Sequence, residues 1–145
     1  VAAITHHKLL ERGRRPVSAG EDGAATALEQ LVVRYRGDLL DGEVIGEWHL
    51  PVRARLQRLC VDALMDLGAY HDSGGRDERA AHAYQRVLSR DPLHETAARA
   101  LLQALLRTGE REQALRVAQR FTQRLQRELG VAPDAETADL IARLR

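Results

Sequence analysis

The chain has 145 residues, of which 44% are apolar and 30% charged, and this composition suits one folded domain and argues against global disorder. Lys and Arg together number 22 and Asp and Glu 21, so the formal net charge is only +1, which argues against a protein that coats nucleic acid by bulk charge. Aromatic residues are 3% of the chain, so the core must consist of Leu, Ala and Val, a composition that favours closely packed helices.

The first 46 residues predict two helices and two loops. Apolar residues at helical spacing indicate helices over residues 2–12 and 22–36, and a glycine- and proline-containing loop over 13–20 separates them. We expect a loop over residues 37–46, whose three glycines favour a turn and whose four apolar side chains should pack against the domain.

The remainder of the chain predicts five more helices. The third begins near residue 47 or 48 and runs to about 71, and the fourth covers about 77–89. We expect Asp91 to cap the fifth helix, with Pro92 at its first position and Gly109 as a left-handed residue after its end. The sixth helix covers about 111–129, and the last one begins at residue 133 or 134 and ends at 144. Since no segment alternates with period two, the sequence predicts an all-α protein of about seven helices.

A repeat of 34 residues is the most informative pattern: the stretch from Gly75 to Ala80 recurs from Gly109 to Ala114. Each copy is a helix, a turn with glycine, and a second helix that begins with acidic residues and a small alanine. This layout resembles the tetratricopeptide repeat (TPR), which implies a right-handed solenoid of antiparallel helix pairs. The first copy carries the family's characteristic residues at the right spacing: Leu64, Leu67, Gly68, Ala80, Tyr84 and Pro92.

The second copy departs from the TPR pattern at three positions. Leu102 replaces the helix glycine, Ala118 replaces the aromatic residue and Gln126 replaces the proline. We expect Phe121, one helical turn after Ala118, to fill the volume that the missing aromatic ring leaves.

The segments around the repeat sharpen the resemblance. They occur in a defined order along the chain: Tyr35-Arg-Gly-Asp-Leu-Leu, Glu47-Trp48, Arg53-x-Arg-Leu56, Asp91-Pro-Leu-His-Glu95 and Glu128-Leu-Gly-Val-Ala-Pro133. Over residues 4–144 this order resembles the bacterial transcriptional activation domain, the TPR-like module beside a winged-helix DNA-binding domain in activators of the antibiotic-regulatory-protein type. One departure is the stretch from His49 to Val52, where the family more often has charged residues.

The resemblance implies a single domain with three parts: a leading helix pair and loop at 1–46, two TPR-like repeats at 47–129 and a terminal helix at 130–145. It also implies a non-catalytic regulatory domain that contacts a protein partner or a second copy of itself. Since no winged-helix pattern is visible here, we expect the DNA-binding domain outside this chain, before Val1, and no direct DNA binding by the chain itself. The alternative is a general TPR scaffold that binds a peptide in another bacterial signalling protein.

No pattern predicts catalysis, a cofactor or a metal site. The chain has no glycine-rich phosphate loop and no G-x-S-x-G, and its six histidines never have H-x-x-x-H spacing. Cys60 is the only cysteine and lies on the apolar stripe of the third helix, where we expect a small buried side chain. With no signal peptide and no apolar stretch that could cross a membrane, we expect a cytoplasmic protein.

Two surfaces are candidates for binding a partner. The first is a stripe of arginines on the sixth helix, which either docks an acidic partner or DNA phosphate, or is simply a solvated face: Arg116, Arg120, Arg124 and Arg127. The second follows from solenoid geometry, in which the first helix of each pair lines the concave side. Its expected residues are Asp62, Met65, Ala69, Thr96, Arg99, Gln103 and Leu106. This groove would suit a peptide with an acidic group, unless the chain's own first helices fill it.

Overall fold

A computed structural model describes residues 50–145 of the chain. The helices expected over residues 2–12 and 22–36, the loop over 37–46 and the expected start of the third helix lie outside these residues. The chain divides into two compact units, Val1–Tyr70 and His71–Arg145.

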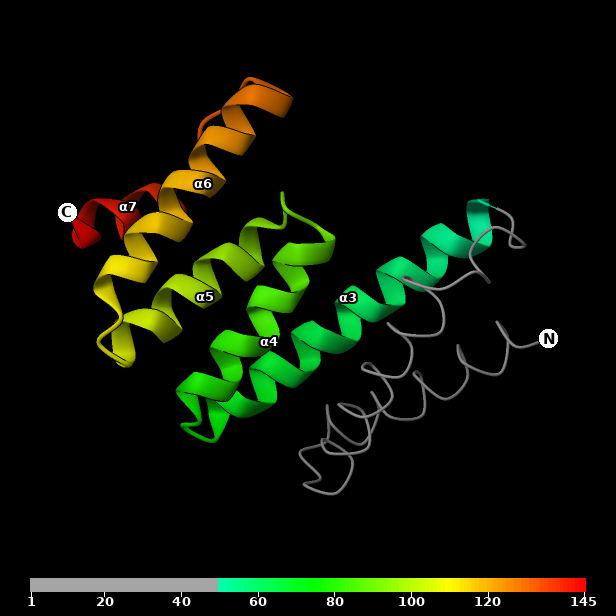
Figure 1. The fold of residues 1–145 in the computed structure, drawn as a ribbon, viewed down its shortest axis with the longest axis horizontal. Coiled ribbons are helices and arrows are strands. Elements are labelled where there is room, and N and C mark those ends of the chain that lie inside the picture. Colours follow the sequence, from blue (N-terminus) through cyan, green and yellow to red (C-terminus); the bar gives the residue numbers. More distant parts are fainter. Residues whose placement is uncertain (1–49) are drawn as a thin grey trace. The chain divides into compact units, whose positions relative to one another are not determined.

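The described part consists of α-helices and contains no strand, so the all-α class is confirmed for it (Figure 1). The helices are α3 (Leu50–Ser73), α4 (Asp77–Arg90), α5 (Glu95–Arg107), α6 (Arg111–Leu129) and α7 (Ala135–Leu144). The total of seven helices, the right-handed solenoid and the three-part division of the domain stay predictions.

Between Leu56 and Leu67, helix α3 buries an apolar stripe. Its buried side chains recur three and four residues apart, as expected for one helix face: Leu56, Leu59, Cys60, Ala63, Leu64 and Leu67. Cys60 is fully buried, as the sequence predicts. The stripe fades toward the end of the helix, where Tyr70 is only half-buried.

The two copies of the repeat form the same turn. Gly75 ends α3 with a φ of 73° and Gly109 ends α5 with a φ of 81°, both in the left-handed region that glycine adopts without steric cost. In each turn the N–H after the glycine bonds back to the carbonyl five residues earlier: Arg76 to His71 at 2.9 Å and Glu110 to Leu105 at 2.8 Å. These bonds satisfy carbonyls that the end of a helix otherwise leaves without a partner.

The helices that follow these turns also begin in the same way. The N–H of Ala80 bonds the carbonyl of Arg76, and the N–H of Ala114 bonds that of Glu110, both at 3.0 Å. Both alanines are fully buried. A small side chain at this point lets the start of the second helix pack closely, which explains why the sequence repeats alanine there.

The start of α5 corrects one prediction. Asp91 still belongs to the end of α4, since its N–H bonds the carbonyl of Val87 at 2.8 Å, and its own carbonyl accepts the N–H of His94. Pro92 therefore occupies the second position of a tight turn, where its fixed φ is favourable, and not the first position of a helix. The cap of α5 is His94, whose Nδ1 accepts the N–H of Ala97 at 3.1 Å.

The core of the second unit is rich in alanine. Helix α5 packs against α4, α6 and α7, and α6 also packs against α7. The fully or almost fully buried side chains come from all four helices: Ala80, Ala83, Tyr84, Val87, Ala97, Ala98, Leu101, Leu102, Ala104, Ala114, Ala118, Leu140 and Leu144. Short side chains let the helix axes approach closely, so few aromatic residues are needed to fill the interior.

Phe121 supplies the large side chain between α5 and α6. It is buried against Ala98 and Leu125, and the partly buried Leu88 and Leu93 cover this cluster. Ala118, by contrast, lines a groove between α6 and α7. Phe121 therefore replaces only part of the volume of the missing aromatic residue, because a groove remains at Ala118.

Candidate functional site

The predicted concave face falls on two helices in separate units. On α3, Asp62 and Ala69 are exposed and Met65 is half-buried. On α5, Thr96 and Gln103 are exposed, whereas Arg99 and Leu106 are half-buried. The two halves of the predicted concave face thus belong to different units, and a shared groove stays a prediction.

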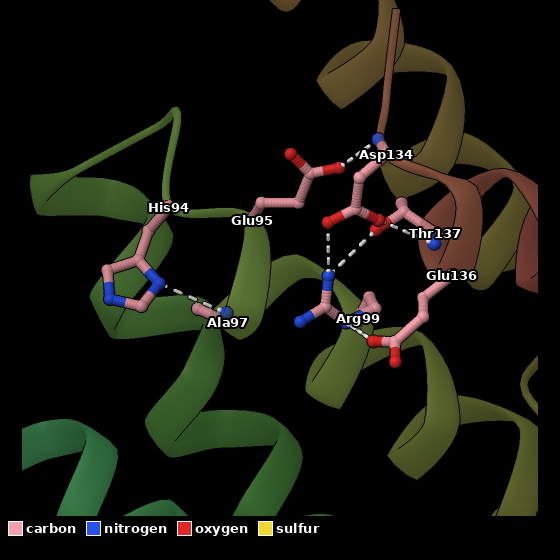
Figure 2. Close-up of polar contacts among 7 residues, drawn as sticks. All are labelled: His94, Glu95, Ala97, Arg99, Asp134, Glu136 and Thr137. Atoms are coloured by element: carbon pink, nitrogen blue, oxygen red, sulfur yellow. Dashed lines mark hydrogen bonds and ion pairs between the residues drawn. The ribbon is translucent and has the colours of Figure 1, made fainter.

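Arg99 is held by the start of α7 (Figure 2). One terminal nitrogen of its guanidinium lies 2.8 Å from Oδ2 of Asp134 and 3.3 Å from Oγ1 of Thr137. Its Nε lies 3.4 Å from Oε2 of Glu136. The side chain of Arg99 is 20% exposed, so these contacts leave little of it accessible to a partner. Its contacts stabilise the packing of α7 on α5.

In a second hydrogen bond between these two helices, the donor lies at the start of α7 and the acceptor on α5. Glu95, in the first turn of α5, accepts the backbone N–H of Asp134 at 2.6 Å. Asp134 itself caps α7, since its Oδ1 accepts the N–H of Thr137 at 2.9 Å. We call Glu95, Arg99, Asp134, Glu136 and Thr137 the α5–α7 clamp. It combines helix capping with ion pairing across two helices.

The clamp changes the acidity of Asp134. The hydrogen bonds from Thr137 favour the charged carboxylate and lower the pKa of Asp134 below its usual value, and the guanidinium of Arg99 acts in the same direction. The clamp is therefore weakened by acid, when this carboxylate is protonated.

A second polar cluster joins the end of α3, the start of α4 and the end of α5. Arg107 contacts Oδ1 of Asp72 at 2.5 Å and Oδ1 of Asp77 at 2.8 Å. The hydroxyl of Tyr84 donates to Oδ2 of Asp72 at 2.7 Å. The aromatic residue of the first repeat copy therefore fills the core and also binds the last turn of the preceding helix, α3.

The same cluster shifts two pKa values. Burial raises the pKa of the Tyr84 phenol, and its hydrogen bond to Asp72 raises the pKa further. The hydrogen bond to Asp77 raises the pKa of Arg107. Both Tyr84 and Arg107 therefore keep their protons at neutral pH.

The arginine stripe lies on the exposed side of α6, where all four side chains reach solvent: Arg116, Arg120, Arg124 and Arg127. Arg124 pairs with Glu128 at 3.1 Å within the helix. Across residues 50–145, no ion pair joins the other three guanidinium groups to a carboxylate. The structure thus places the stripe where a partner could reach it.

In the part of the chain that the structure describes, no group of three or more His, Cys, Asp or Glu side chains is placed to hold a metal ion. Among those same residues, no helix is both long and apolar enough to cross a membrane.

Sequence reasoning missed the two polar clusters. The partners that join different helices are 12 to 39 residues apart in the chain, so neither helical periodicity nor a short motif relates them. One available signal is the position of the carboxylates Asp77, Glu95 and Asp134 at or before the first turns of helices, where negative charge is favourable.

Comparison with known proteins tests the resemblance directly. The family model described as the bacterial transcriptional activator domain matches residues 4–145, and no curated protein or solved structure gives a significant match. The matched range includes both copies of the repeat and agrees with the range expected from the order of motifs. The chain therefore belongs to the family of bacterial transcriptional activator domains.

Proposed function

We propose that this chain is a non-catalytic interaction domain of a bacterial transcriptional regulator. The family match over residues 4–145 is the observation that carries this proposal, because the matching family is described as a transcriptional activator domain. The domain would act by contacting a protein partner or a second copy of itself.

The chemistry of the second unit supports an interaction role. Its polar groups around Arg99 and Arg107 are paired within the chain and join one helix to another. Groups used in this way stabilise a scaffold and are not free to act on a substrate. The exposed face of α6 is, in contrast, rich in arginines that can meet another molecule.

The proposal includes a winged-helix DNA-binding domain outside this chain, as the family resemblance implies. The chain itself would not read DNA, because its charge is nearly balanced and its arginine stripe contains no aromatic side chains between the arginines. A role in transcription also places the protein in the bacterial cytoplasm, where the DNA is.

The alternative is a peptide-binding TPR scaffold that uses the predicted concave face. Exposed Thr96 and Gln103 on α5 would support it, but Arg99, the residue expected to meet an acidic group, already contacts Asp134 and Glu136. A Gln103→Glu variant tests this alternative, because Gln103 is exposed and outside the α5–α7 clamp. Loss of a partner on this substitution would favour the concave face.

A comparison of transcripts tests the proposed function. Deleting the gene should change the transcript levels of a set of promoters, and the full-length product of the gene should restore them. A full-length product in which the two core alanines Ala80 and Ala114 are both replaced by leucine should fail to restore them. Unchanged transcripts in the deletion strain, or full restoration by this variant, would overturn the proposed function.

A further inference from the structure

A groove lies between α6 and α7 in the second unit. It has a volume of about 280 Å³, and its lining combines apolar and polar side chains: Leu115, Ala118, Gln119, Thr122, Gln123, Ile141 and Arg145. This volume is just below the roughly 300 Å³ at which small-molecule sites begin, so it suits one or two protein side chains better than a cofactor.

The sequence explains why the groove exists. In the first copy of the repeat, the aromatic ring of Tyr84 is buried and packs into the core. Ala118 has the equivalent position in the second copy, 34 residues later, and its methyl group forms part of the wall of the groove. A large side chain is thus replaced by a small one where α6 meets α7, and space remains.

Positive charge borders one side of this groove. Helix α6 contains five arginines and only two glutamates. Arg116 lies three residues before Gln119, and Arg120 lies three residues before Gln123, so helical spacing places both arginines beside the glutamines of the rim. Neither arginine is paired with a carboxylate of residues 50–145, so both can pair with a partner.

We propose that an acidic amphipathic helix of a protein partner docks in the α6–α7 groove. Its apolar side chains enter between Leu115 and Ile141, and its carboxylates, spaced four residues apart, meet Arg116 and Arg120. An apolar face flanked by charge is the usual way in which a helix binds a groove between helices. The proposal rests on the proposed interaction role and assigns the surface and the partner chemistry.

The apolar lining favours a protein over DNA. Phosphate groups would use the arginines of α6 but would leave the apolar walls of the groove exposed to water. An amphipathic helix uses both features, because it covers the apolar walls and supplies the negative charge. The two partners therefore differ in whether apolar side chains contribute to binding.

The test uses a fluorescein-labelled synthetic helix of roughly 16 residues, long enough for appreciable helicity. The parent peptide has leucines on one face and glutamates spaced four residues apart beside them. A second peptide has lysine for every glutamate, and a third has glutamine for every leucine. Fluorescence anisotropy of each peptide is measured during titration with the chain, at low and at moderate salt, beside a labelled DNA duplex.

We expect saturable binding of the parent peptide that weakens with salt, and clearly weaker binding of both altered peptides. Arg120→Glu should weaken binding of the parent peptide about fivefold, because a favourable charge contact becomes a repulsive one. Arg79→Glu is the matched control: it makes the same change of charge at an exposed site on α4 and should change affinity by less than about twofold.

The assignment would be overturned if the parent peptide showed no saturable binding. It would also be overturned if Arg120→Glu and Arg79→Glu lowered the affinity for the parent peptide equally, or if the leucine and glutamine peptides bound equally well. A DNA duplex that binds more tightly than the parent peptide would show a phosphate surface and also overturn it. These outcomes leave the proposed function standing, since that depends on the transcripts of the deletion strain and not on this groove.

Discussion

Replacing Gly109 by alanine tests the turn that the repeat predicts. Gly109 has a φ of 81°, and a Cβ atom added there would meet no other atom within 4 Å. The substitution therefore adds strain to the backbone without any clash. Its cost should come from the left-handed conformation alone.

Two opposing contributions set the change in the free energy of unfolding that Gly109→Ala should cause. A residue with a Cβ atom is less stable in the left-handed region by about 1–2 kcal/mol. Alanine also restricts the unfolded chain more than glycine does, which returns about 0.4–1 kcal/mol. We expect Gly109→Ala to lower the free energy of unfolding by about 1 kcal/mol, which corresponds to about 4 °C in Tm for a chain of this size.

Urea unfolding followed by circular dichroism measures this difference, with Gly109→Asn as the matched control. Asparagine is larger than alanine but tolerates the left-handed region much better, so its cost should be less than about 0.5 kcal/mol. If alanine costs nothing, or asparagine costs as much as alanine, the strain argument for this turn is wrong.

Three further predictions concern the core and the two polar clusters. Ala80→Leu and Ala114→Leu should each destabilise the chain by about 1–3 kcal/mol in urea unfolding, because both sites are fully buried, and equal stability to wild type would contradict the close packing there. Tyr84→Phe should cost about 1 kcal/mol at neutral pH by removing the bond to Asp72. Because the pKa of Tyr84 is raised on folding, wild-type stability should also fall as the pH rises above about 10, and the phenylalanine variant should lack this part of the loss. The pKa of Asp134 is lowered on folding, so its contribution is present above about pH 4 and lost as the pH falls; Asp134→Asn should show a smaller loss of stability in acid than wild type.

Local patterns predicted much of the described fold. The bounds of α6 match the expected range of 111–129, and the turns at Gly75 and Gly109 are the same, as the repeat implies. Such features depend on residues close together in the chain, where helical periodicity and the special conformation of glycine are directly visible. The predicted start of α5 was wrong, because a proline such as Pro92 suits a turn as well as the first position of a helix.

The contacts between helices could not be predicted in the same way. The bond of Arg99 to Asp134 joins residues 35 positions apart, and it depends on the packing of α7 against α5. The groove at Ala118 likewise depends on the position of α7, which the sequence of α6 does not contain. The arginine stripe was predicted from spacing alone, because exposure on one helix face follows from periodicity.

Titration of labelled promoter DNA with this chain tests most directly the claim that the domain acts through protein contacts. The promoters are those whose transcripts change when the gene is deleted, and a scrambled duplex of equal length is the control. The account predicts weak binding that is equal for both duplexes and disappears at moderate salt. Tighter binding to the promoter than to the scrambled duplex, persisting at moderate salt, would contradict it.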